Sequence, residues 1–337
     1  MRTILEFVRN ADANSVARTR DVLFIDTPIT GPTVEAVHKL RAEGYRVVYR
    51  DHHAVEGEPA SDRDRQVINA TEKLRQSLGA DCVITTRTLH PACSTLVEVG
   101  EFKDALAIIA DPDPDGLTAA MKAVGLFYEG LDEDAAKLDG QPSLQVTGTP
   151  LSQLLAKGVA TLPIYDPQKP HERERATEIL FSQWVQAVQG EQRAIDALQQ
   201  GVTTYDDAVA AAREIAPSAK EIVPGVVLVD VVETPFYDVG TLLALLEERP
   251  GCKVTVIRKG KGPIAALHGV QYSLAVAKNF QSEIKLPSFL PPHAKSDPNG
   301  GIISNLSFLL HVNEFVWQDH VLPGLRNKLG SHVTNQS

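Results

Sequence analysis

The stretch YRDHHAVEG, residues 49–57, places one aspartate and two histidines in a row at the end of an apolar segment. Three such polar side chains are rarely adjacent where a strand leaves a sheet. Asp51, His52 and His53 are therefore candidates for a functional site. The alternative is a chance triplet in an ordinary loop. The surrounding segments distinguish between these two interpretations.

The segments around this triplet alternate between two patterns. DVLFIDTP (21–28), ADCVITTR (80–87) and ALAIIADPDPDG (105–116) are apolar and rich in strand-forming residues. TVEAVHKLRAEG (33–44) has a helical apolar face, and a helical LTAAMKAVGLFYEG segment begins at residue 117. Strands that alternate with helices predict an α/β fold with a parallel sheet and right-handed crossovers.

Polar residues follow the predicted strands where each one ends. In parallel sheets, ligands bind beyond the carboxyl ends of the strands. The residues expected at that edge are Asp26, the triplet 51–53, the TTRTLHP segment, and Asp111, Asp113 and Asp115. A single acid at a strand end is usually a turn former or a helix cap, but four strands delivering acids and imidazoles to one edge favour a site.

Carboxylates with some imidazole are ligands that suit Mn²⁺ or Mg²⁺. Asp111, Asp113 and Asp115 alternate, so an extended chain would not point all three in one direction; a turn permitted by Gly116 can make them converge. Such close carboxylates repel one another unless a cation neutralises them. Two metal ions roughly 3.5–4 Å apart would clamp a phosphoryl group and generate a hydroxide nucleophile.

The second half of the chain has a different organisation. Residues 171–215 lack proline and predict a connecting helix or pair of helices. Beyond them, VVLVDVV, CKVTVIRKG and VQYSLAVAK predict strands and GTLLALLEERPG a helix, which together make a smaller α/β unit. A proline- and glycine-rich loop then precedes IISNLSFLLHVNEFVWQDHV, which we interpret as a final helix. The predicted domains are 1–165, 166–217 and 218–337.

Composition excludes several classes of protein. The net charge of −10 argues against high-affinity binding of long nucleic acids, but not against a small phosphorylated substrate. No apolar run reaches the roughly 20 residues of a membrane span, and the N-terminus does not resemble a signal peptide. Cys82, Cys93 and Cys252 lack CxxC spacing, which indicates free thiols and a cytoplasmic protein.

In these motifs the sequence resembles the DHH phosphoesterase superfamily, which includes RecJ-type exonucleases, oligoribonucleases and manganese pyrophosphatases. The resemblance rests on Asp51-His52-His53, on Asp26 ending the previous strand, on IIADPDPDGLTAAMKAV and on HPACSTLVEV. It covers about residues 1–165. It extends more weakly into 220–310, where YSLAVAK and DPNGG are similar to a strand and a glycine loop of the family's companion substrate-binding domain.

The order of the motifs departs from the family. Alternating aspartates normally come first, whereas here they follow the DHH triplet. Either the order is rotated, or NADAN (10–14) is a degraded first motif and Asp111 is a late acid. The rotated order is favoured because too few residues separate NADAN from DVLFID, although it leaves the family's fourth acid unassigned. The C-terminal loop lacks the family's histidine after its glycines, for which His293 is a possible substitute.

The resemblance implies roles for individual residues. Asp26 would bridge two Mn²⁺ or Mg²⁺ ions, with Asp111 and Asp113 at one ion and Asp115 and His52 at the other. Asp51 would orient an imidazole, and His53 would contact the phosphate or assist the leaving group. The residues implied to hold substrate are Arg87, His90, Ser94 and Thr95 in the first domain and Arg258, Asn299, Gly300 and Gly301 in the second.

The predicted function is metal-dependent hydrolysis of phosphodiester bonds in short single-stranded oligonucleotides or dinucleotides. Two alternatives stay open: a phosphomonoesterase or pyrophosphatase for a small nucleotide or phosphate compound, and a scaffold that has lost catalysis. The retained aspartates and histidines disfavour the scaffold. The expected partner is a short nucleic acid or small nucleotide and not a membrane, and an oligomer is possible.

Overall fold

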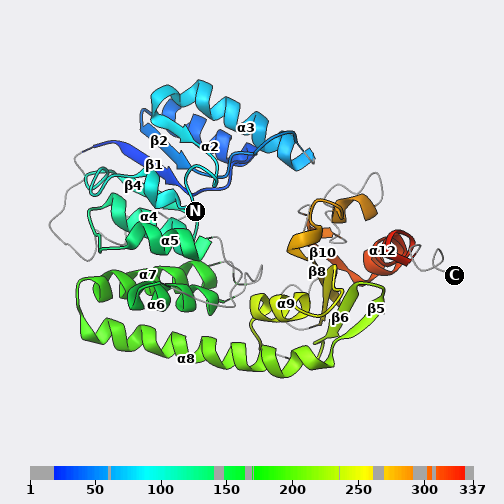
Figure 1. Cartoon of the computed structure of the whole chain (residues 1–337). Coiled ribbons are helices and arrows are strands. Elements are labelled where there is room, and N and C mark those ends of the chain that lie inside the picture. The colour runs from blue at the N-terminus through cyan, green and yellow to red at the C-terminus, as the bar shows by residue number, and fades with distance from the viewer. Residues whose placement is uncertain are drawn as a thin grey trace. The chain divides into compact units, whose positions relative to one another are not determined.

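A computed structural model shows two compact units, which are described separately below (Figure 1). The structure describes residues 19–59, 62–139, 148–163, 169, 171–234, 236–260, 269–290, 302–305 and 309–330. The described residues up to 204 that pack together form unit 1, and those from 205 onward form unit 2. The division between the two units therefore falls within one long helix, and the predicted boundaries at residues 165 and 217 stay a prediction.

Unit 1 is built on a four-stranded sheet of order β3-β2-β1-β4. All three strand pairs are parallel, so the predicted α/β fold with a parallel sheet is confirmed. The strands are β1 (Asp21–Ile25), β2 (Arg46–Asp51), β3 (Cys82–Ile84) and β4 (Ala107–Ala110). The connecting elements are α2 (Gly31–Ala42), α3 (Asp62–Leu78), η1 (Gly79–Asp81) and η2 (Cys93–Leu96), and α4 (Pro114–Ala123) follows β4.

The central strand β1 is buried on both faces, which explains its unbroken apolar sequence VLFI. Leu23 and Ile25 pack with alanines of α4 on one face. Val22 and Phe24 pack on the other face with apolar residues of α2 and α3. Figure 1 shows α2 and α3 on one side of this sheet and α4 on the other.

The strand order places a topological switch point between β1 and β4. The chain runs from β1 to β2 and β3 in one direction, and then returns across β1 to β4 on the opposite side. Ligand sites of parallel α/β sheets lie in the crevice at such a point, beyond the carboxyl ends of the strands. Asp26 follows β1 and Asp111 follows β4, so both sequence motifs reach this position.

The predicted connecting helices 171–215 are present, but they belong largely to the core of unit 1. Helices α7 (Glu172–Val188) and α8 (Gln192–Ile215) lie in this range, and α5 (Leu131–Asp139) and α6 (Pro150–Ala160) precede them. Phe181 and Trp184 of α7 share one buried cluster with Leu117 and Met121 of α4. These helices therefore hold α4, and with it the aspartates at its N-terminus.

Unit 2 contains a six-stranded sheet of order β5-β6-β7-β8-β10-β9. Its strands are β5 (Lys220–Val223), β6 (Val226–Asp230), β7 (Val254–Lys259), β8 (Gln271–Val276), β9 (Ile302–Asn305) and β10 (Leu309–Asn313). β6 and β7 are parallel, and the other neighbours are antiparallel. Its remaining elements include α9 (Val239–Glu247), η3 (Ala216–Ser218), η4 (Lys278–Phe280) and η5 (Leu286–Phe289).

The prediction of one final helix over IISNLSFLLHVNEFVWQDHV was wrong. The first part of this segment forms β9 and β10, and helix begins only at α11 (Glu314–Val316). It continues through a π-helical turn, η6 (Trp317–Val321), into α12 (Leu322–Gly330). Leu310 and Val312 are buried and their neighbours are less so, a period of two that fits a strand. Asn313 then caps the helix by accepting a hydrogen bond from the Val316 N–H.

Within the described ranges, none of the helices combines the length and apolar character that crossing a bilayer requires. Cys82, Cys93 and Cys252 are all free thiols.

Candidate metal centre

Asp26 lies at the middle of the site, directly after β1. Among the described residues it is the one non-glycine residue at positive φ, 50°. Its backbone N–H donates to the Arg50 carbonyl oxygen at 3.0 Å, which holds it beside the end of β2. Its side chain is buried, yet neither carboxylate oxygen has a hydrogen-bond partner. A strained backbone that presents an unpaired buried carboxylate points to a functional position.

His52 presents one nitrogen to this carboxylate. Its Nδ1 lies 2.8 Å from the His90 carbonyl oxygen, which can only accept, so Nδ1 donates and carries the proton. In the neutral ring Nε2 then has a free lone pair, and it has no hydrogen-bond partner in the structure. A histidine held through one nitrogen in this way is typical of a metal ligand.

Three carboxylates surround His52 Nε2. The distances are 3.4 Å to Asp26 Oδ1, 3.3 Å to Asp115 Oδ2 and 3.7 Å to Asp139 Oδ2. Burial lowers the pKa of His52, but the contact with Asp26 and the other acids outweighs it and raises the pKa to about 9. Without a cation, these acids therefore favour a proton at the position where a metal ion would also be stabilised.

The alternating aspartates converge because α4 begins within them. Asp113 is the N-cap of α4, and its Oδ1 accepts a hydrogen bond from the Gly116 N–H at 2.8 Å. Asp115, in the first turn, is fully buried and accepts from the Cys93 N–H at 2.8 Å through Oδ2, while its Oδ1 has no partner. A side chain at Gly116 would collide with the Asp111 carbonyl oxygen, so glycine permits this turn.

The pKa shifts of these aspartates describe an acidic cluster. Burial first, and then the charge of Asp26, raise the pKa of Asp115 to about 7. The same two causes raise the pKa values of Asp111 and Asp113. The pKa of Asp26 is lowered instead: its burial opposes ionisation, but His52 and His53 outweigh that effect. Asp26 is therefore the carboxylate most firmly ionised in the cluster.

Asp139 is a site residue that sequence reasoning did not find. It is the last residue of α5, its side chain is 6% exposed, and it lies beside His52. It also pairs with Arg87, whose Nη2 is 2.9 Å from Asp139 Oδ1. A carboxylate at a helix C-terminus is disfavoured by the helix dipole. That unfavourably placed charge was the available signal in the sequence.

Two groups of side chains could each hold a metal ion. One group consists of Asp26, His52 and His53, and the other of His52, Asp115 and Asp139. Within each group the potential ligand atoms lie within 4.8 Å of one another. The unpaired Asp26 oxygens, His52 Nε2 and Asp115 Oδ1 are the atoms that a divalent cation would satisfy, so the residues fit the implied metal. Among the described residues, Asp111 and Asp113 complete neither group.

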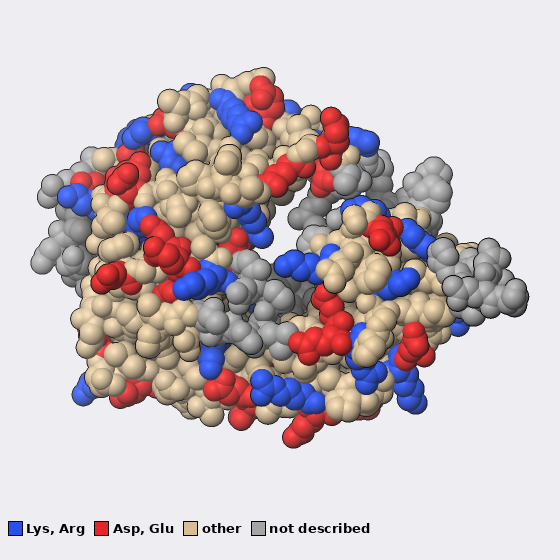
Figure 2. Space-filling view, viewed as in Figure 1, with Lys and Arg blue, Asp and Glu red and all other residues tan. Residues whose placement is uncertain are grey.

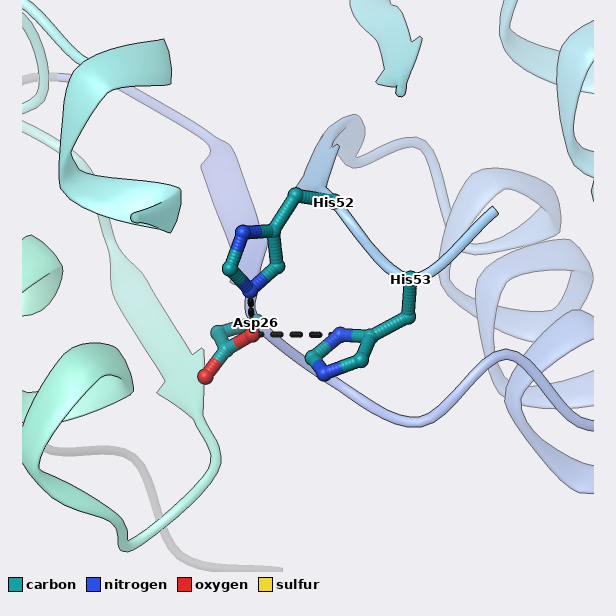
Figure 3. A group of neighbouring side chains, drawn as sticks. All are labelled: Asp26, His52 and His53. Carbon is teal, nitrogen blue, oxygen red and sulfur yellow. Dashed lines mark ion pairs between the residues drawn. The ribbon is translucent and has the colours of Figure 1, made fainter. Parts of the chain in front are cut away.

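Asp51 lies next to this centre and positions His53. The Asp51 carboxylate accepts from the His53 N–H at 2.6 Å, which fixes the turn after β2. His53 Nδ1 lies 3.3 Å from Asp26 Oδ1 and 3.4 Å from Asp51 Oδ2. Figure 3 shows both imidazoles directed at the same Asp26 oxygen, His52 through Nε2 and His53 through Nδ1.

Arg87 contacts the outer edge of His53. Its Nη2 lies 2.6 Å from His53 Nε2. Arginine only donates, so His53 accepts at Nε2 and its remaining proton is on Nδ1, facing the two carboxylates. The His53 side chain is 37% exposed and that of Arg87 49%, whereas His52 is fully buried. The two adjacent histidines thus occupy different surroundings, one enclosed and one accessible to a ligand.

Two of the other residues expected to hold phosphate in unit 1, His90 and Thr95, have hydrogen-bond partners within the protein. His90 orients His52 through its carbonyl group, and its ring nitrogen lies 2.9 Å from Thr95 Oγ1. Thr95 in turn donates to the Ala92 carbonyl oxygen at 2.6 Å. Ser94 is buried, and its hydroxyl has no hydrogen-bond partner.

The expected substrate residues of unit 2 are only partly described. Arg258 belongs to a polar network: its Nη1 is 2.7 Å from Asp230 Oδ2, and its Nε donates to the Tyr272 hydroxyl at 3.0 Å. Asn299, Gly300 and Gly301 lie outside the described residues, as do His293 and the NADAN segment. Their assignment to the substrate remains a prediction.

The geometry alone defines the kind of site. It is a buried cluster of carboxylates and histidines at the switch point of a parallel α/β sheet, and it suits divalent cations. No family model and no curated protein matches the chain. Among solved structures, a pGpG-specific phosphodiesterase, PggH from Vibrio cholerae, is similar over 92% of this chain and 99% of its own. The identity is 10% and the TM-score 0.44. The site is therefore interpreted from its own residues.

Proposed function

We propose that the chain is a metal-dependent phosphoesterase that hydrolyses phosphodiester bonds of short single-stranded oligonucleotides or dinucleotides. The observation that carries the proposal is the set of unpaired buried atoms of Asp26, His52 and Asp115 at the switch point of the sheet. Together with the DHH and DPDPDG motifs, this set favours a phosphoesterase over a scaffold, because an unused cluster of buried acids would only destabilise the fold.

The residues divide into roles. Asp26, His52, Asp115 and Asp139 would hold two Mn²⁺ or Mg²⁺ ions, with Asp111 and Asp113 added by the resemblance. When bound, such ions stabilise charge on the phosphoryl oxygens and lower the pKa of a water molecule. His53 and Arg87 form the accessible edge of the site and would bind the phosphate, since Arg87 already donates to neighbouring acceptors there.

The surface favours a short substrate. Figure 2 shows Lys and Arg interspersed with Asp and Glu across the visible face of the described residues. With a net charge of −10, this distribution offers little attraction to a long polyanion. A dinucleotide or short oligonucleotide needs only the local cation cluster and Arg87. We further propose a cytoplasmic location, since three free cysteines suit a reducing compartment.

The test is a product assay with Mn²⁺ or Mg²⁺ on labelled substrates: dinucleotides including pGpG, oligonucleotides of increasing length, nucleoside monophosphates and pyrophosphate. We expect cleavage of dinucleotides and short oligonucleotides, abolished by EDTA and by Asp26→Asn. Asp21→Asn is a matched control, because Asp21 lies at the opposite end of the same strand and pairs with Arg46. Release of phosphate from monophosphates or pyrophosphate alone would favour the alternative activity, and no turnover of any substrate would contradict the proposal.

A further inference from the structure

One face of the sheet in unit 2 carries apolar side chains on some strands and polar side chains on others. Over β6 and β7 this face is apolar: Val227, Val229 and Ile257 pack against Leu242 and Leu246 of α9. No residue of β8 or β10 belongs to that cluster among the described residues. The apolar cluster on this face therefore ends at β7.

Polar side chains replace the apolar ones on this part of the face. Lys259 of β7 pairs directly with Gln271 of β8, and Ser273 of β8 pairs directly with His311 of β10. Directly paired residues of antiparallel strands project to the same face with neighbouring side chains. Tyr272, between Gln271 and Ser273, belongs to the apolar core on the opposite face. Lys259, Gln271, Ser273 and His311 thus form one polar patch.

The patch contains a buried donor without a partner. Gln271 is 3% exposed, and its Nε2 has no hydrogen-bond partner. Leaving such an amide without an acceptor destabilises the fold, so a buried donor without a partner needs an explanation. In the metal centre the orphan atoms are mainly carboxylate oxygens, which require a cation. Here the orphan is a donor, which requires an acceptor.

The patch also contains a cation without a counter-charge. Lys259 is partly buried, and burial alone lowers the pKa of its ammonium group. No carboxylate of the described residues forms an ion pair with it. The nearby His311 is held neutral, because burial and the charge of Lys259 lower its pKa to about 4, and its Nδ1 lies 2.7 Å from Ser273 Oγ. The patch therefore offers one positive charge, amide and hydroxyl groups, and no negative charge.

We infer that Lys259 and Gln271, with the Ser273–His311 pair beside them, form a phosphate-binding site within unit 2. A phosphate oxygen can accept from the Gln271 amide while the phosphate charge compensates the Lys259 ammonium group. Its residues all belong to unit 2, and the inference goes beyond the proposed hydrolytic function. Its ligand is either free phosphate or the phosphate group of a nucleotide.

The experiment titrates the full chain in EDTA with inorganic phosphate and, in a second series, with a 5′-mononucleotide, followed by isothermal calorimetry. The central variant is Gln271→Glu, which keeps the shape of the side chain but places a carboxylate beside Lys259. It should weaken phosphate binding by roughly 10- to 100-fold, the range for loss of hydrogen bonds to charged groups. Lys259→Met should weaken binding similarly, and the exposed Lys220→Met is the matched control.

Folding does not obscure the result, because the carboxylate of Gln271→Glu supplies the missing counter-charge and should leave the melting temperature equal to or above that of the wild type. Tighter binding of the mononucleotide identifies a nucleotide ligand, and equal binding identifies free phosphate. Wild-type affinity in Gln271→Glu, or no phosphate binding by the wild type at millimolar concentration, would overturn the inference. Asp26→Asn should bind phosphate normally, so failure of hydrolysis alone would contradict only the proposed function.

Discussion

Replacing Asp115 by asparagine should stabilise the metal-free protein while weakening its binding of metal. Asp115 is fully buried, and its pKa is raised from 3.8 to about 7 by burial and by the charge of Asp26. The folded state therefore holds a proton that the unfolded state releases between pH 3.8 and about 7. Stability is lost as the pH rises through that window, and the full penalty is present above it.

The size of this penalty follows from the shift. About three pKa units correspond to roughly 4 kcal/mol, an upper value because the neighbouring acids titrate together. Asparagine keeps the oxygen that accepts from the Cys93 N–H, so the turn into α4 should survive. In EDTA at pH 8, Asp115→Asn should unfold at higher denaturant concentration than the wild type by up to this amount. At pH 4 to 5 the difference should largely disappear.

The assay is denaturant unfolding at pH 4.5 and pH 8, with EDTA and with Mn²⁺. Added Mn²⁺ should stabilise the wild type strongly and Asp115→Asn much less, because ligands that bind only the folded state stabilise it by mass action. Asp21→Asn should follow the wild type under every condition. This reasoning holds that the carboxylates of the cluster repel one another unless a cation is bound. It would be refuted if Asp115→Asn were less stable than the wild type in EDTA at pH 8.

Three further predictions follow from the same structure. His52→Ala should weaken Mn²⁺ binding, measured by calorimetry, and turnover should partly recover at high Mn²⁺. His53→Ala should keep the metal stoichiometry and lower turnover by roughly 10²–10⁴-fold. The reverse pattern would exchange the roles of the two histidines. Asp139→Asn should lower the affinity for one of two ions, and unchanged titrations would remove Asp139 from the centre. The contribution of His311 to stability should fall by up to about 3 kcal/mol as the pH drops from 6.5 to about 4, opposite in sign to that of Asp115, because the unfolded state protonates His311 while its folded pKa is about 4. His311→Gln, which can still hydrogen-bond Ser273, should flatten that dependence in unfolding curves, and an unaltered profile would assign it to other groups.

The sheet of unit 1 could be predicted because its strands are buried on both faces. Such strands read as short apolar runs, and each ends at the polar residues that the site uses, as Ile25 is followed by Asp26. The final helix could not be separated from a strand pair in this way. LLHVN is short and apolar, and its period of two becomes decisive only when it pairs with β8.

The site residues that sequence did not reveal are those placed by tertiary packing. Asp139 reaches His52 only because α5 packs against α4, a contact between segments with no motif in common. The role of His90 was also hidden, since it orients His52 through a backbone carbonyl that any residue could supply. Strand register places Arg258 beside Asp230 and Tyr272, and its expected role at the substrate stays a prediction.

The rotated order of motifs can be reconciled with a working site, because a parallel sheet depends on which strands are adjacent and not on the order in which the chain visits them. β4 pairs with β1 in parallel register, so its aspartates reach Asp26 although they follow the DHH triplet in sequence. The two orders differ in their use of Asp115, and Asp115 lies 3.3 Å from His52 Nε2 in a group that also includes Asp139. In the alternative order, only Asp111 of these aspartates would contact a metal ion. That order does not explain why Asp115 is buried with an unpaired oxygen. The burial of Asp115 therefore agrees better with the rotated order, and we propose Asp139 as the acid that this order leaves unassigned.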